Sequence, residues 1–129
     1  MKKKIFLLLL IALFLVTITA SFAGCGFLKE ITLNEAKENL ESAGYTVTVT
    51  SGSEYARSEQ NTYMLMSTEL ENYLYAVNGD DVIYMYFLTD VDTASRNYEF
   101  MQAPNGLLGG QNNKVVYFGT KKATKAAKV

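Results

Sequence analysis

Two β-prone runs flank the tetrapeptide Asn78-Gly79-Asp80-Asp81 in this chain of 129 residues. The first run covers residues 72–77 and the second covers residues 82–88. Asn-Gly between two such runs is a strong hairpin signal, because both residues tolerate the positive φ that a tight turn requires. The second run is apolar on both faces, as in a central strand. The sequence therefore predicts a hairpin that turns at Asn78-Gly79 inside a sheet.

Tyrosines alternate along both arms of this predicted hairpin: Tyr73, Tyr75, Tyr84 and Tyr86. Two registers are open, one that pairs Val77 with Val82 and one built on a two-residue Asn-Gly turn. Side chains alternate along a strand, so either register puts all four tyrosines on one face, which we call the tyrosine face. Its rings and hydroxyls suit the binding of a sugar, a peptide or a protein partner. The alternative is cross-strand aromatic pairing that only stabilises the sheet.

A helix and a strand are predicted before the hairpin. Thr32 and Glu35 have the spacing of a capping box, in which each side chain accepts a hydrogen bond from the backbone of the other residue. Apolar residues then recur on one helical face until Gly44, which suits the position after a helix end. Residues 45–50 are rich in β-branched residues and alternate strictly between apolar or aromatic residues and threonines, a pattern typical of a strand with one solvent-exposed face.

After the hairpin, residues 90–101 are predicted to form a helix that Asp90 or Asp92 caps. Residues 115–118 follow as a strand, and Thr120 can cap a last helix over residues 121–128.

The remaining segments are predicted to be irregular. Residues 51–62 and 102–113 are expected to form loops, whereas residues 63–66 fit either a short strand or a helical turn. This order predicts an α+β fold, with a small antiparallel or mixed sheet of about four strands and helices packed on one face. Strand 82–88, helix 90–101 and strand 114–118 are expected to form a right-handed crossover.

The N-terminus has the features of an export signal. Three lysines precede a run of 16 residues without a charge, Ile5 to Ala20, and small residues follow. Ala23-Gly24-Cys25 resembles the lipobox of bacterial lipoproteins, although Phe22 stands where leucine is usual. The resemblance implies lipid attachment to the Cys25 thiol and cleavage just before it. The alternatives are an uncleaved anchor over residues 5–23, which is long enough to span a bilayer, and an ordinary cleaved signal.

The predicted domain organisation follows from this signal. Residues 1–24 form the signal peptide, residues 25–30 a short lipid-anchored tether and residues 31–129 a single α+β domain. The signal contains three of the 12 basic residues and none of the 13 acidic ones, so nine basic residues remain against 13 acids, a net charge of −4. A domain with this charge should not be drawn to an anionic membrane face, and the net charge of −1 on the whole chain gives no electrostatic reason to expect nucleic-acid binding.

The composition removes most catalytic machinery. The chain has no histidine and only one cysteine, so the usual general base and thiolate zinc sites are missing. The acids of Asp80-Asp81 and of Asp90-x-Asp92 are close enough to share a proton in catalysis or to bind Ca²⁺. Turn formation and helix capping already explain all four acids. We therefore expect no catalytic residue, no metal site and no cofactor. The lysines of residues 121–128 fit a solvated helix end or contacts with anionic lipid or teichoic acid.

The segments YFLTDVDTASRNYEF and VVYFGTKKATKAA are similar to small uncharacterised lipoproteins of Gram-positive bacteria, over roughly residues 70–127. This resemblance implies no activity. The expected function is that of an extracytoplasmic lipoprotein, anchored to the bacterial cell membrane through Cys25 and binding an unknown envelope protein, peptide or glycan without catalysis. The alternatives are an accessory or inhibitory subunit of an envelope complex and an enzyme that works with carboxylates alone.

Overall fold

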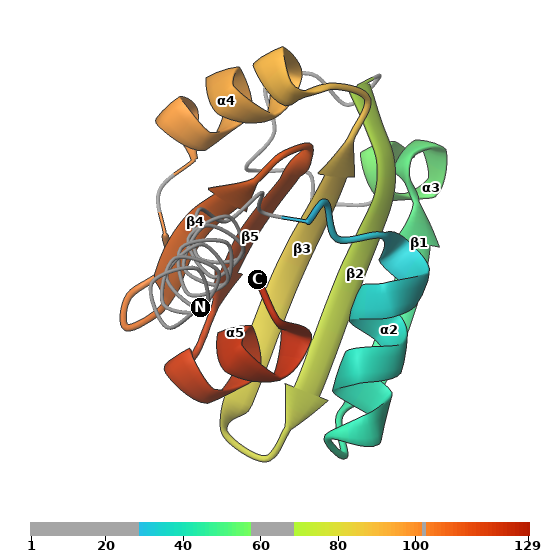
Figure 1. Ribbon diagram of the computed structural model, residues 1–129. Coiled ribbons are helices and arrows are strands. Elements are labelled where there is room, and N and C mark those ends of the chain that lie inside the picture. Colours follow the sequence, from blue (N-terminus) through green and yellow to red (C-terminus); the bar gives the residue numbers. More distant parts are fainter. Residues whose placement is uncertain (1–28, 58–68, 102) are drawn as a thin grey trace, which may run out of the picture.

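A computed structural model describes residues 29–57, 69–101 and 103–129 (Figure 1). The elements follow in the order α2 (Leu33–Ser42), β1 (Thr46–Ser51), α3 (Gly52–Arg57), β2 (Leu70–Asn78), β3 (Asp81–Leu88), α4 (Val91–Phe100), β4 (Leu108–Asn112), β5 (Val115–Gly119) and α5 (Lys121–Ala127). The strands form one antiparallel sheet in the order β1-β2-β3-β5-β4. The α+β class is confirmed, with five strands in place of about four.

Helices contact both faces of this sheet. Helices α2 and α5 lie side by side over one face, as predicted (Figure 1). On the opposite face, Tyr55 of α3 and Ala94 of α4 belong to a second buried cluster. The prediction of helices on one face therefore holds only for α2 and α5. The tyrosines explain the difference, because a face with four aromatic rings is apolar enough to bury part of its area under further helices.

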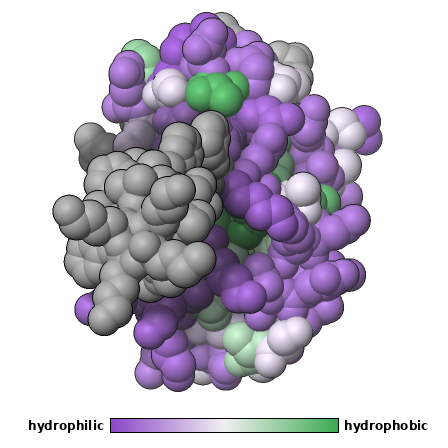
Figure 2. All heavy atoms as spheres, viewed as in Figure 1, coloured by the Kyte–Doolittle hydropathy of each residue, from purple (hydrophilic) through white to green (hydrophobic). Residues whose placement is uncertain are grey.

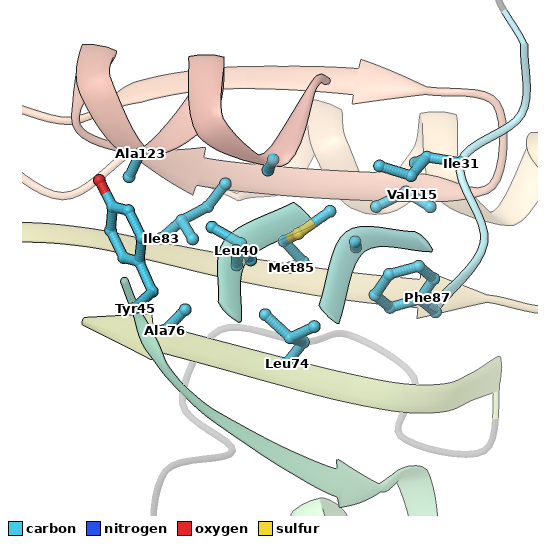
Figure 3. Packing of buried hydrophobic residues seen from close by; sticks show 12 residues of the cluster. Ile31, Leu40, Tyr45, Leu74, Ala76, Ile83, Met85, Phe87, Val115 and Ala123 are labelled. Carbon is cyan, nitrogen blue, oxygen red and sulfur yellow. The ribbon is translucent and has the colours of Figure 1, made fainter. Parts of the chain in front are cut away.

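The core under α2 and α5 contains the side chains that alternate with the tyrosines. Leu74 and Ala76 of β2 and Met85 of β3 are fully buried there against Leu40 of α2 (Figure 3). Ala123 of α5 closes the cluster at the other side. The parity of the hairpin thus separates an aliphatic face from an aromatic one.

The start of α2 confirms the predicted capping box. The Thr32 hydroxyl accepts a hydrogen bond from the Glu35 amide at 3.2 Å, and the Glu35 carboxylate accepts one from the Thr32 amide at 3.1 Å. Gly44 follows the helix with a φ of +89°, where a glycine is favoured. Asp90 and Thr120 likewise cap α4 and α5, as the sequence predicts.

Two predicted loops contain regular structure. Residues 52–57 form α3, and residues 108–112 form the edge strand β4. The prediction of a right-handed crossover is wrong, because a crossover joins parallel strands and β5 runs antiparallel to β3. The added strand β4 pairs with β5 and reverses the chain direction before β5 begins. Strand β4 is not predicted from the sequence because its two glycines have weak strand propensity, and the contacts that hold them come from β5. A Cβ on Gly109 would come within 2.9 Å of the Phe118 ring, and a Cβ on Gly110 would come too close to the Tyr117 ring and hydroxyl on the other face.

Residues 63–66 and the predicted lipobox lie outside the described residues. Among the helices of residues 29–57, 69–101 and 103–129, none is long and apolar enough to cross a membrane.

Candidate functional site: the tyrosine face

The β2–β3 hairpin brings all four tyrosines to one face, as their parity predicts. Tyr73 pairs with Tyr86 and Tyr75 with Tyr84, which is the register in which Val77 faces Val82. Asn78 and Asp81 form the last pair, so the two loop residues are Gly79 and Asp80. The predicted turn at Asn78-Gly79 is therefore one residue too early. Gly79 has a φ of +61°, the conformation for which glycine was expected at this turn.

One half of the tyrosine face is core. Tyr73 is 8% exposed and Tyr86 is 5% exposed, and both contact the buried Tyr55 of α3. The Tyr55 ring centre lies 4.6 Å from that of Tyr73 and 5.9 Å from that of Tyr86. The rings of Tyr73 and Tyr86 are themselves 5.2 Å apart. These are the separations that aromatic pairs prefer, so the three rings stabilise the fold as a unit.

Gly52 permits α3 to lie over this half of the face. It is the first residue of α3 and is buried against β2. A Cβ on Gly52 would overlap the backbone carbonyl of Leu70, so only glycine fits here. Ser51 supports the same turn, because its hydroxyl accepts a hydrogen bond from the Glu54 amide at 3.3 Å. The predicted loop thus begins with a helix that carries Tyr55 onto the sheet.

Burial fixes the protonation of the core tyrosines. Desolvation raises the pKa of Tyr73 above its ordinary value, and the neighbouring phenols raise it further. Desolvation also raises the pKa of Tyr86, and a hydrogen bond with Tyr55 adds to the effect. Both hydroxyls therefore stay neutral even near pH 10, where an exposed tyrosine ionises, and neither is suited to act as a general base.

The other half of the tyrosine face is half-buried. The Tyr75 and Tyr84 rings lie 5.2 Å apart at an interplanar angle of 37°, and they pack against the edge of the second cluster. Thr48 of β1 pairs with Tyr75 on one side, and Phe118 of β5, which is itself buried at 3% exposure, pairs with Tyr84 on the other. These four residues form a row across the sheet on one face, which we call the aromatic row.

Tyr98 of α4 extends the aromatic row at its β5 end. Its ring stacks on Phe118 with centres 6.4 Å apart and an angle of 26° between the planes, and the residue is 36% exposed. The described residues on the side of α2 and α5 present a mostly hydrophilic surface (Figure 2). The aromatic row, on the opposite face, combines flat rings and hydroxyls in a way that suits stacking on sugars or contact with peptides.

The acids singled out in the sequence have structural partners. Asp90 accepts a hydrogen bond from the Thr93 amide at 2.7 Å, and this bond is the main cause of its lowered pKa. Asp81 accepts one from the Thr120 hydroxyl at 3.0 Å and forms an ion pair with Lys122 at 3.5 Å. Asp80 lies in the hairpin loop, and Asp92 lies in the first turn of α4. In the described part of the chain, no cluster of acidic or sulfur ligands could hold a metal ion.

Sequence reasoning missed two contributors to this site. The sequence predicts a loop at Tyr55, and it predicts for Tyr98 only a place in the helix of residues 90–101. Ser51-Gly52-Ser53 before an acidic residue resembles a helix start, and this signal could have indicated α3. Comparison of the chain with protein-family models, with curated proteins and with solved structures gave no match.

Proposed function

We propose that the protein is a lipid-anchored extracytoplasmic module that binds a partner through the aromatic row. The observation that carries the proposal is the contrast within the tyrosine face. Tyr73 and Tyr86 are buried by α3, whereas Tyr75 and Tyr84, on the same two strands, keep part of their surface open. Binding surfaces are rich in such tyrosines because a ring and a hydroxyl offer contact area at a low entropic cost.

The anchor is proposed from the sequence Ala23-Gly24-Cys25 after a run without charges. A diacylglyceryl group on Cys25 would hold the domain close to the bilayer, since the tether of residues 25–30 is short. Metabolic labelling with a tagged fatty acid tests this step. We expect the chain to label and the Cys25→Ala variant to remain an unlabelled precursor, and labelling of the variant would contradict the anchor.

The binding surface is tested by a double variant, Tyr75→Thr with Tyr84→Thr. Threonine keeps the strand propensity of these positions but removes both rings. We expect cell-envelope peptides or glycans that bind the wild-type chain to lose at least about tenfold in affinity for the variant, as is typical when aromatic anchors are removed.

Phe100→Ala is the matched control, because this exposed ring of α4 has no contact with the aromatic row among those described. Its affinity should equal that of the wild type. Equal loss of binding in the control and the double variant, or retained binding in a folded double variant, would refute the proposed surface.

A further inference from the structure

Strand β1 is an edge of the sheet. Among the described residues, its only hydrogen-bonded neighbour is β2, which it pairs from Thr46 to Ser51 without a register shift. In an antiparallel ladder, alternate residues of an edge strand direct their N–H and C=O groups away from the sheet. The outer side of β1 thus offers a regular row of donors and acceptors to a further strand.

Natural sheets usually protect such an edge with a charged residue, a proline or a bulge. Strand β1 has none of these, because its sequence is Thr46-Val47-Thr48-Val49-Thr50-Ser51. Its valines lie on the face of α2, since Val47 pairs with Ala76 and Val49 with Leu74. Val49 is 39% exposed, which leaves an apolar side chain at an open edge.

The segment from Thr46 to Thr50 reads the same in both directions. We propose that β1 pairs antiparallel with β1 of a second copy of this chain, around a two-fold axis at Thr48. Val47 then faces Val49 of the second copy, and Thr46 faces Thr50 of the second copy. Every threonine meets a threonine and every valine a valine, so no charge is buried and no polar group faces an apolar one. The strand is complementary to itself, which favours a second copy over an unrelated peptide.

The helix above the edge leaves room for this arrangement. The buried residues of α2 pack on Leu74 and Ala76 of β2 and on Val47 of β1, so α2 lies over these two strands (Figure 1). Neighbouring strands are about 4.8 Å apart, which places the two α2 helices roughly 10 Å apart across the axis. Packed helices are typically about 8–10 Å apart, so α2 and its copy would come into contact without overlap.

The inferred dimer goes beyond the proposed function and does not depend on it. A two-fold axis perpendicular to the sheet keeps each face continuous across the interface. The aromatic row would therefore extend from Tyr84 through Tyr75 and Thr48 into the second copy, in a sheet of ten strands. Two six-residue strands bury less than the roughly 1,600 Å² of a standard interface, so we expect a dimer that dissociates on dilution.

Single cysteines along β1 test the register in the full chain, purified in detergent micelles and treated with a mild oxidant. At the axis, Thr48→Cys is about 4.5–5.5 Å from its copy between Cα atoms, which a disulfide can bridge. Thr46→Cys and Thr50→Cys are roughly 14 Å from their copies and cannot be bridged. The parent chain, with Cys25 alone, gives the background.

A cross-linking maximum at Thr48→Cys supports the dimer. Equal cross-linking at all three positions, or none above the parent chain, overturns it.

A second measurement uses the mass of the full chain in micelles, followed by sedimentation over a range of concentrations. Val49→Lys puts a charge on the apolar side of the edge and should raise the dissociation constant of the dimer at least about tenfold. Val91→Lys makes the same change at an exposed valine of α4 and should leave the constant unchanged.

A chain that stays monomeric at every concentration, as expected if β1 instead binds a foreign peptide, overturns the proposal, and so does an equal effect of both lysines. Neither readout requires a ligand, so failure of the dimer is distinct from failure of the aromatic row.

Discussion

Replacing Tyr86 by alanine should remove the centre of the second buried cluster. Its ring lies 5.2 Å from that of Tyr73, 5.9 Å from that of Tyr55 and 6.5 Å from that of Phe118. Truncating a buried aromatic residue to alanine costs about 3–5 kcal/mol of unfolding free energy. Tyr86→Phe removes only the hydroxyl that hydrogen-bonds with Tyr55, which should cost about 1 kcal/mol.

Tyr84→Ala is the matched comparison, since Tyr84 is on the same strand and the same face, two residues before Tyr86. Tyr84 is half-buried, so its truncation should cost about 2 kcal/mol or less. Urea unfolding of residues 26–129, followed by circular dichroism, measures both variants. With a slope of about 1.5 kcal/mol per molar urea, Tyr86→Ala should lower the midpoint by about 2–3 M and Tyr84→Ala by roughly 1 M.

The order of the two losses decides whether the division of the tyrosine face is correct. A loss for Tyr84→Ala that equals or exceeds that for Tyr86→Ala would mean that Tyr84 is core. The aromatic row would then lack an exposed tyrosine at this position, and the proposed binding surface would be refuted.

Two further predictions concern a backbone contact and a helix cap. Gly52→Ala should cost about 3 kcal/mol or more, because its Cβ would overlap the Leu70 carbonyl; a urea midpoint like that of the wild type would show that α3 does not lie against β2 here. Hydrogen bonds from Thr93 lower the pKa of Asp90 below its unfolded value of about 3.9, so its contribution is complete above that pH and is lost as the pH falls through the folded pKa. The stability difference between wild type and Asp90→Asn should therefore shrink below about pH 4, and a constant difference from neutral to acid pH would contradict this.

Local signals predicted the elements whose cause is local. The capping box at Thr32 and Glu35 and the caps at Asp90 and Thr120 join residues three positions apart, and the parity of the tyrosines needs only one hairpin. All of these features are present. The β1 strand was equally clear, because its alternation needs no partner to be recognised. These features could be predicted because the sequence positions that interact are close together.

The elements that could not be predicted depend on distant partners. Strand β4 contains Gly109 and Gly110, which have weak strand propensity, and it is held by Phe118 and Tyr117 of β5. Helix α3 has six residues and depends on the contact of Tyr55 with Tyr73 and Tyr86. A helix this short is not stable on its own, so its sequence carries no strong helical pattern.

The extent of α3 determines how the tyrosine face is divided. Four tyrosines of the same chemistry occupy adjacent pairs, Tyr73 with Tyr86 and Tyr75 with Tyr84, and the sequence gives no reason to treat the pairs differently. The difference arises because α3 follows β1 directly at Gly52 and carries Tyr55 onto the first pair. The second pair lies nearer the Gly79 turn and is only half-buried. A stabilising contact at one end of the hairpin therefore leaves an aromatic surface at the other, and the β1 edge beside it is where a second copy would extend that surface.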